Sequence, residues 1–244
     1  MSNSILNRVQ MFLTEANKAS VGVSSTIVKE FGQACEDAFK KQFTEQHDRT
    51  FRTRMSNIGR PLCQLQMEKS GAEAEPMPYN FKMRNLFGDM IEAAAVAILK
   101  ASGVKVDAIQ KKVKHKFDDG SEIDGTYDIK IQNNIYDIKS ASPWAFENKF
   151  GDNGGFDAIQ KEDSFGYVPQ GYLYASADNT DFAGWIAINK STGEWAVTET
   201  PLADQKHSSD ALKKAKDNMD ALKNCLKMKK SSLIEKLQVI KYYH

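Results

Sequence analysis

The stretch 122–142, which reads EIDGTYDIKIQNNIYDIKSAS, constrains the fold more than any other part of the chain. Apolar and polar residues alternate in two runs, 123–131 and 135–141, and Asn133-Asn134 lies between the runs. Alternation with a period of two indicates β-strands, and asparagine tolerates the positive φ that a two-residue turn requires. The sequence therefore predicts a β-hairpin that turns at Asn133-Asn134.

One face of this predicted hairpin gathers carboxylates and lysines. Side chains two residues apart share a face of a strand, so Asp124 and Asp128 lie together on the first strand. A regular turn at the asparagine pair places Asp128 opposite Lys139, which brings Asp137 and Lys139 to the same face. Hard oxygen ligands beside a lysine are the chemistry of a divalent-metal site. The alternative is a solvated face that carries ordinary cross-strand charge pairs.

Composition narrows the class of protein. A chain of 244 residues with 41% hydrophobic residues can bury the core of one large α/β domain. Three scattered cysteines predict neither a disulfide framework nor a zinc site, and the four histidines show no ligand spacing. No signal peptide opens the sequence and no apolar run approaches membrane-spanning length. We therefore expect a cytoplasmic protein that makes no use of a membrane.

Charge is distributed unevenly along the chain. Although the net charge is only +1, residues 1–117 carry 18 basic and 12 acidic side chains, residues 118–182 carry 4 and 13, and residues 183–244 carry 11 and 7. An acidic middle between basic ends fits a cation-binding centre held between surfaces that contact phosphate. It also fits acidic residues that merely lie in loops.

Other periodic segments surround the hairpin and predict an α/β fold with a mixed central β-sheet flanked by helices. No linker divides the chain, so we expect one domain over 1–244. We expect helices over 24–43, 80–102, 167–177 and 208–241. Ser24 or Ser25 would cap the first of these helices, and Gly103 would end the second. The expected strands are 104–108, 111–117, the central hairpin and a second hairpin within 182–202, and a long connection covers 143–166.

Glu92 lies at the border of the apolar stripe of the helix expected over 80–102. The residues around it read GDMIEAAAVAIL, so the acid is flanked by Ile91 and three alanines. Burying a carboxylate among such residues is costly without a partner. We therefore expect Glu92 to face a polar site.

The order of these elements resembles the PD-(D/E)XK nuclease superfamily, in particular its RecB-like and lambda-exonuclease-like branches and the nucleases of that kind that phages encode. The resemblance covers roughly residues 54–175. Four elements in this order carry it: a helix with an acid, a strand with Asp, a strand with Asp-x-Lys and a helix with Gln and Tyr. The corresponding residues are Glu92 in GDMIE, Asp124 in EIDG, Asp137 and Lys139 in YDIKSAS, and Gln170 and Tyr174 in QGYLY.

The resemblance implies a restriction-endonuclease-like core over 54–202, with a helical extension over 1–53 and a lysine-rich helical extension over 203–244. It implies hydrolysis of DNA phosphodiester bonds that depends on Mg²⁺, with Mn²⁺ as a substitute, by an exonuclease of DNA recombination, replication or host DNA degradation. Alternatives are a structure-specific or restriction-like endonuclease and a non-catalytic DNA-binding subunit. The expected partners are DNA and either further copies of the chain or a phage single-strand-binding or recombination protein.

The resemblance also implies roles for residues. Asp124, Asp137 and the carbonyl of Ile138 would hold the metal, and Glu92 would complete one site or help to bind a second ion. Asp128 is a rival for the first carboxylate, since Asp124 reaches Asp137 only if the strand bends.

A bulge at Gly125 could supply that bend. Lys139 would polarise the attacking water or stabilise developing charge, Gln170 would position Lys139 or the water, and Tyr174 would brace the helix or touch phosphate.

Contacts to DNA are expected from the segment before the core and from the second strand. Arg54, Ser56 and Arg60 would bind a terminal phosphate, or else form an exposed basic helix end, and Ser140 would contact DNA. The iron–sulfur members of this branch need four cysteines. Only Cys63 and Cys225 lie in comparable regions, so we expect no cluster and place both in the core.

Overall fold

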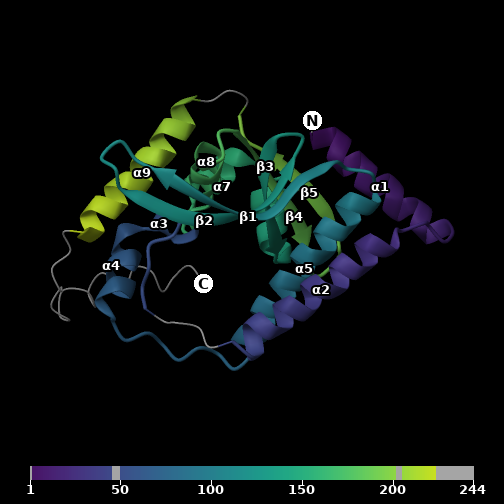
Figure 1. The fold of residues 1–244 in the computed structure, drawn as a ribbon, viewed down its shortest axis with the longest axis horizontal. Helices are drawn as coiled ribbons and strands as arrows, with labels where there is room; N and C mark the ends of the chain where they lie inside the picture. The colour runs from purple at the N-terminus through teal and green to yellow at the C-terminus, as the bar shows by residue number, and fades with distance from the viewer. Residues whose placement is uncertain (1, 46–49, 202–204, 224–244) are drawn as a thin grey trace.

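The computed structural model of the protein describes residues 2–45, 50–201 and 205–223. Its centre is a five-stranded mixed sheet with helices on both faces, as Figure 1 shows. The expected α/β class with a mixed, helix-flanked sheet is therefore confirmed. Within the described residues, no helix combines the length and the apolar composition needed to cross a membrane.

The strands follow one another across the sheet in chain order. They are β1 (Val106–Lys116), β2 (Glu122–Ile131), β3 (Asn134–Ala141), β4 (Asp181–Asn189) and β5 (Trp195–Glu199). The pairs β1–β2, β2–β3 and β4–β5 are antiparallel, whereas β3 and β4 are parallel. A parallel pair needs a crossover connection, and α8 (Tyr167–Ala177) lies in it.

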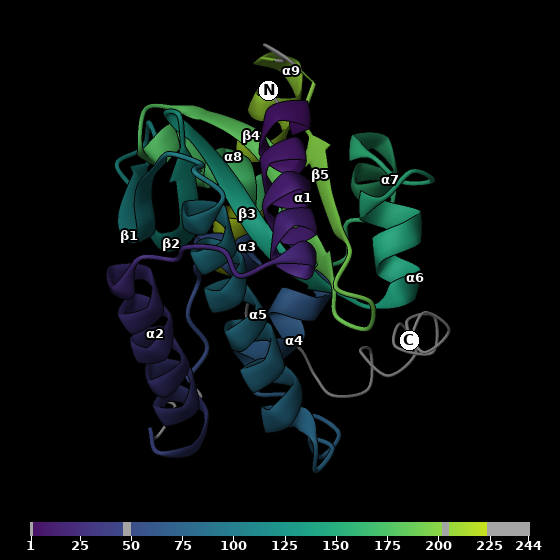
Figure 2. The ribbon, with the colours of Figure 1, turned by 90° about the vertical axis from the view of Figure 1, so that its right-hand side faces the viewer.

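Two apolar clusters separate the helices into two layers. One face of the sheet packs against α1 (Ser2–Lys18) and α5 (Phe81–Ala101), and α2 (Ser25–Phe43) lies against α5. Figure 2 shows these three helices in front of and beside the sheet. The opposite face packs mainly against α8, and the further elements of the described chain on that side are α3 (Met55–Ile58), α4 (Leu62–Ser70), α6 (Pro143–Ala145), the π-helix η1 (Phe146–Phe150), α7 (Phe156–Lys161) and α9 (Gln205–Lys223).

Local signals place the ends of the main helices. The Ser24 hydroxyl accepts the Ile27 N–H at 3.3 Å and caps α2. Gly103 follows α5 with a φ of +77°, a conformation that glycine adopts without steric cost. The Asp163 carboxylate accepts the N–H groups of Tyr167 and Val168 at 2.7 and 3.0 Å and so starts α8.

The turn of the central hairpin differs from the prediction by one residue. Gln132 and Asn133 form the turn, with φ values of +49° and +63°, and Lys130 pairs with Ile135. The Asp107 carboxylate holds this turn by accepting the Asn133 N–H at 2.7 Å. Continuing this register by two residues sets Asp128 across from Asp137 rather than from Lys139. The predicted turn at Asn133-Asn134 is therefore wrong.

The alternation of faces along the hairpin is interrupted near Asp128. Tyr127 packs in the α8-side cluster, whereas Ile129, two residues later, packs in the cluster with α1 and α5. In the neighbouring strand, Ile109 pairs with Ile129 and Lys111 with Tyr127, so Gln110 stands across from Asp128, and its φ is +46°. The two short strands predicted over 104–108 and 111–117 are thus one strand that is irregular at Gln110.

Gly125 lies in a regular part of the β1–β2 ladder, so the bulge predicted there is absent. The glycine serves close packing instead. A Cβ at this position would lie 2.6 Å from the Met55 sulfur and 2.6 Å from Tyr174 Cε1. The missing side chain thus lets α3 and α8 approach β2.

The remaining sequence expectations have mixed outcomes. The helix over 167–177 and the hairpin within 182–202 are confirmed, and the 143–166 connection contains α6, η1 and α7. The helix predicted over 208–241 is present as far as Lys223, and its remainder lies outside the described residues, as does Cys225. Cys63, expected in the core, is half-buried. The division into a core over 54–202 and two extensions stays a prediction.

Gly125→Ala should lower the free energy of unfolding by about 1–3 kcal/mol, because the added methyl group must displace Met55 or Tyr174. Urea unfolding followed by circular dichroism measures the change. Gly32→Ala in α2 is the matched control, since a Cβ there meets no atom within 4 Å. Helix propensity alone should then raise the free energy of unfolding by about 0.5–1 kcal/mol. Equal effects of the two substitutions would contradict close packing at Gly125.

Candidate functional site

Acidic and amide side chains gather where β2 and β3 separate. The ladder between these strands ends at the pair Ile129 and Tyr136. Beyond that pair, Asp128 Oδ2 accepts the N–H of Ile138 at 2.8 Å. The carboxylate of Asp128 thus takes the place of the strand carbonyl that would otherwise bond this N–H. The side chain is thereby directed into the gap between the strands.

Asp137 is the buried centre of the cluster, with 2% of its surface exposed. Gln170 of α8 donates from Nε2 to Asp137 Oδ1 at 3.3 Å and to the Tyr174 hydroxyl at 3.1 Å. Lys139 Nζ lies 2.6 Å from Asp137 Oδ2 and forms an ion pair with it. Each carboxylate oxygen has more than one lone pair, so Asp137 Oδ2 can accept a further ligand beside this ion pair.

Lys139 lies between a carboxylate and an aromatic ring. Its Nζ is 4.4 Å from the ring centroid of Tyr167, at the start of α8, which is the geometry of a cation–π contact. Burial alone would lower the pKa of Lys139, but the Asp137 carboxylate outweighs burial and raises the pKa above its ordinary value. Lys139 is thus a charged ammonium group at neutral pH and can attract anions rather than accept a proton.

Glu92 approaches the cluster from α5, on the other side of the sheet. Gln110 donates from Nε2 to Glu92 Oε1 and, at 3.4 Å, to Asp128 Oδ1. One helical turn before Glu92, Asp89 accepts hydrogen bonds from Lys41 at 2.9 Å and Gln42 at 2.7 Å. The expectation that Glu92 faces a polar site is therefore met, and α2 is tied to the same side of α5.

The carboxylates repel one another. Burial, and then the nearby Asp137, raises the pKa of Glu92 to about 7. Burial, Asp137 and Glu92 raise the pKa of Asp128 well above its ordinary value. Such a surplus of hard oxygen donors fits a divalent cation such as Mg²⁺, and Oδ2 of Asp137 could serve as a ligand. The described residues do not, however, hold three acidic, histidine or cysteine side chains already arranged around a common point.

The structure brings most of the predicted site residues together, but Asp124 lies apart from them. Its side chain is 78% exposed and lies 3.7 Å from Lys114 of β1. The strand is regular around Gly125, so nothing bends Asp124 toward Asp137. Asp128, the rival carboxylate, lies in the cluster instead. Members of the cluster that were also predicted are Glu92, Asp137, Ile138, Lys139, Gln170 and Tyr174.

The predicted DNA-binding residues are divided. Arg54 and Ser56 are exposed at α3. Arg60 is half-buried and lies 3.3 Å from Glu68, and its backbone lies near Gly166, the residue before Tyr167. This proximity follows from close contact between the backbones at Gly59 and Gly166.

Ser140 alternates with Lys139 along β3, so its side chain lies on the opposite face of the strand.

Two members of the site were not predicted from the sequence. Tyr167 lies three residues before Gln170, a spacing that puts both on one side of a helix, so this aromatic could have been noticed. Gln110 had no such signal. It lies among charged residues of a strand, and its place depends on the register of β1 against β2 and on its own positive φ.

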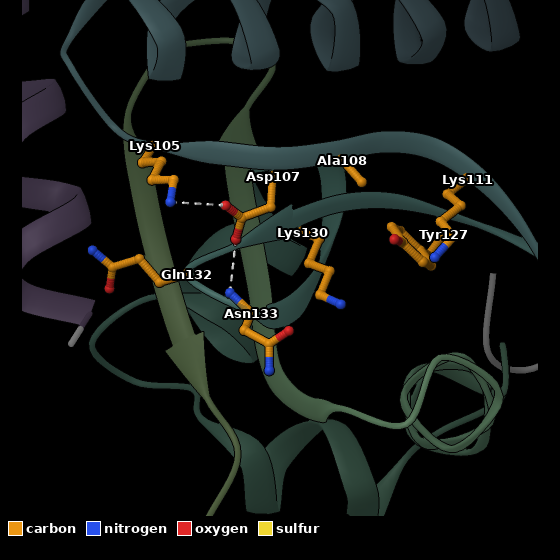
Figure 3. Close-up of a pocket in the computed structure, with 8 residues that line it drawn as sticks. All are labelled: Lys105, Asp107, Ala108, Lys111, Tyr127, Lys130, Gln132 and Asn133. Carbon is orange, nitrogen blue, oxygen red and sulfur yellow. Dashed lines mark hydrogen bonds and ion pairs between the residues drawn. The ribbon is translucent and has the colours of Figure 1, made fainter.

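A pocket of about 530 Å³ lies near the turn end of the hairpin and includes no member of the acidic cluster. Figure 3 shows its lining residues, which are Lys105, Asp107, Ala108, Lys111, Tyr127, Lys130, Gln132 and Asn133. Two of its lysines bind Asp178 at the end of α8, Lys111 at 2.5 Å and Lys130 at 3.0 Å. These ion pairs tie the hairpin to the last turn of α8.

Comparison with models of known protein families gives no match, and no curated protein sequence matches the chain. Among solved structures, the chain is similar to one titled "Crystal structure of SSO0001". The sequence identity is 13%, the match covers 78% of this chain and 85% of that chain, and the TM-score is 0.43. A likeness at this level carries no information about function.

Glu92→Gln should stabilise the protein above pH 7. The ordinary pKa of the Glu92 carboxyl is 4.5 and its folded value is about 7, so between these values the folded protein binds more protons than the unfolded chain. Stability is therefore lost as the pH rises through this window. Because glutamine does not titrate, Glu92→Gln should raise the free energy of unfolding by about 1–3 kcal/mol above pH 7 and by less near pH 4.5.

Urea unfolding in EDTA at several pH values tests this expectation. Glu15→Gln on α1 is the control, since Glu15 is exposed and paired with Lys18 in the same helix. Its effect should stay within about 0.5 kcal/mol at every pH. A pH-independent effect of Glu92→Gln would show that the Glu92 carboxyl titrates normally.

Proposed function

We propose that this chain is a divalent-metal-dependent nuclease of the PD-(D/E)XK type that hydrolyses DNA phosphodiester bonds. One observation carries the proposal: Asp137 and Lys139 of β3 meet carboxylates from β2 and α5 and an amide from α8 at a single cluster. Negative ligands for a cation and a permanent positive charge for an anion are thus adjacent. Phosphodiester hydrolysis needs both.

Asp128, Asp137 and Glu92 supply hard oxygen ligands suited to Mg²⁺ or Mn²⁺. The Ile138 carbonyl would be a further ligand, because the N–H and C=O of one strand residue point to the same edge and the Ile138 N–H faces the gap. When bound, the cation would neutralise phosphate charge and lower the pKa of a water molecule. Asp128 thereby takes the role expected of Asp124.

The other residues of the site orient charge. Lys139 keeps its proton, so it would contact a phosphate oxygen and stabilise charge that develops there. The ring of Tyr167 contacts the ammonium group of Lys139 in a cation–π interaction, and Gln170 orients Asp137 by a hydrogen bond. Tyr174 accepts the second hydrogen bond of Gln170 and thereby braces it.

We further propose an exonuclease that acts on DNA ends in recombination, replication or host DNA degradation, as phage-encoded nucleases of this type do. An unused donor on Arg60 supports end recognition, since a terminal phosphate carries more negative charge than an internal one. The Arg60 Nε is buried and has no hydrogen-bond partner, so it retains a donor for an anion. Digestion of linear but not of covalently closed circular DNA in Mg²⁺ tests this proposal.

Asp137→Asn and Asp128→Asn should each reduce Mg²⁺-dependent cleavage by about a hundredfold or more, because each removes an anionic ligand worth several kcal/mol of charge stabilisation. Asp124→Asn is the matched control on the same strand and should keep most activity. End-labelled linear duplex DNA reports the rates. DNA binding in EDTA should persist or strengthen in the Asp137 variant, since a negative charge near phosphate is lost.

The ranking of the two β2 carboxylates decides the assignment. Inactivation by Asp124→Asn with a fully active Asp128→Asn would show that the active hairpin is bent differently. Full cleavage by Asp137→Asn would exclude the cluster as the active site. DNA binding without cleavage by the unchanged protein would favour a non-catalytic DNA-binding subunit.

Arg60→Ala should slow the digestion of 5′-phosphorylated ends more than that of dephosphorylated ends. A guanidinium fork suits a terminal phosphate, and loss of a charge-assisted contact costs on the order of 1.5–3 kcal/mol, or roughly ten- to a hundredfold in rate at limiting substrate. Arg8→Ala on α1, across the sheet, is the control and should affect neither substrate. An equal loss on both ends would assign Arg60 to general backbone contact.

A further inference from the structure

Gln110 has a backbone conformation that its residue type rarely adopts. Its φ of +46° lies in the left-handed region, although it stands within β1. Such a conformation is strained for a residue with a side chain and persists only where the surroundings favour it. The conformation therefore points to a contact that the Gln110 side chain makes.

That contact joins two carboxylates that repel each other. The Gln110 amide nitrogen donates to Glu92 Oε1 and to Asp128 Oδ1 at 3.4 Å. An amide –NH₂ group has two N–H donors, so one neutral group can bond both acids. A cation bound between the same acids would use the oxygen lone pairs that these hydrogen bonds occupy.

We propose that Gln110 is a positioning residue that stands in for a cation: its amide holds Glu92 and Asp128 together until a divalent cation displaces it. This inference rests on the metal site of the proposed function. It predicts that Gln110 competes with the cation and so sets how tightly the cation binds.

The surroundings of Gln110 permit this exchange. The residue is exposed, so its side chain can turn toward solvent without leaving a cavity. Asp128 keeps its second oxygen on the Ile138 N–H, and Asp137 keeps its bond from Gln170. Departure of the amide therefore frees one oxygen each of Glu92 and Asp128 while the rest of the site stays held.

Titration calorimetry with Mn²⁺ alone, on the full chain, tests the proposal. Gln110→Gly is the informative variant, because glycine keeps the left-handed backbone without strain and removes only the side chain. Gln132→Gly is the matched control, since Gln132 has a φ of +49° but lies in the hairpin turn. Above neutral pH, Gln110→Gly should bind Mn²⁺ about tenfold more tightly than the unchanged protein. This is the change in affinity expected when one competing charge-assisted hydrogen bond is removed. Gln132→Gly should leave the affinity unchanged.

A second readout guards against a merely structural effect. Mn²⁺ should raise the urea midpoint of Gln110→Gly more than that of the unchanged protein, since at one ligand concentration a more tightly bound ligand stabilises the folded state more. Equal affinities would show that the amide does not compete. Weaker binding by Gln110→Gly would make Gln110 a metal ligand through its carbonyl oxygen. Absence of Mn²⁺ binding in all three proteins would overturn the metal site itself, and with it the proposed function.

Discussion

A buried carboxylate on the central strand is the constraint on which the rest of the site depends. Asp137 is almost fully buried, and a buried charge is costly unless it is paired and hydrogen-bonded. Lys139 supplies the opposite charge and Gln170 the hydrogen bond. Because Gln170 belongs to α8 and Lys139 rests on Tyr167 of the same helix, packing of α8 against β3 and electrostatic balance at Asp137 require each other.

The charge balance around Asp137 is incomplete, and this fits a site that binds a cation. Glu92 and Asp128 add two further acids to the cluster, and burial together with the nearby carboxylates raises the pKa of both. If the cluster served only to stabilise the fold, an apolar or amide side chain in place of Glu92 or Asp128 would be more favourable. Sites that bind ligands commonly give up stability in this way, because the groups that the ligand needs oppose one another without it.

Signals local in the sequence predicted much of this architecture. The helix over 167–177, the start of α2 at Ser24 and the end of α5 at Gly103 depend on caps and on apolar spacing within one segment. The Asp-x-Lys pair and the Gln and Tyr of α8 are likewise recognisable from spacing, since residues two apart in a strand or four apart in a helix share a face. Asp137 with Lys139, and Gln170 with Tyr174, were therefore predictable as two pairs from spacing, whereas only the resemblance to PD-(D/E)XK nucleases implied that the two pairs meet.

The choice between Asp124 and Asp128 was decided only by the tertiary structure. Alternation predicts faces only while a strand is regular, and β1 departs from regularity at the register shift between Val106 and Ala108 and at the positive φ of Gln110. The hairpin turn likewise depends on a bond from Asn133 to Asp107, 26 residues away. By itself, the sequence determined the principal helices α2, α5 and α8, the two hairpins and which acids could meet. Contacts between distant segments selected the register, and the register selected the carboxylate that reaches Asp137.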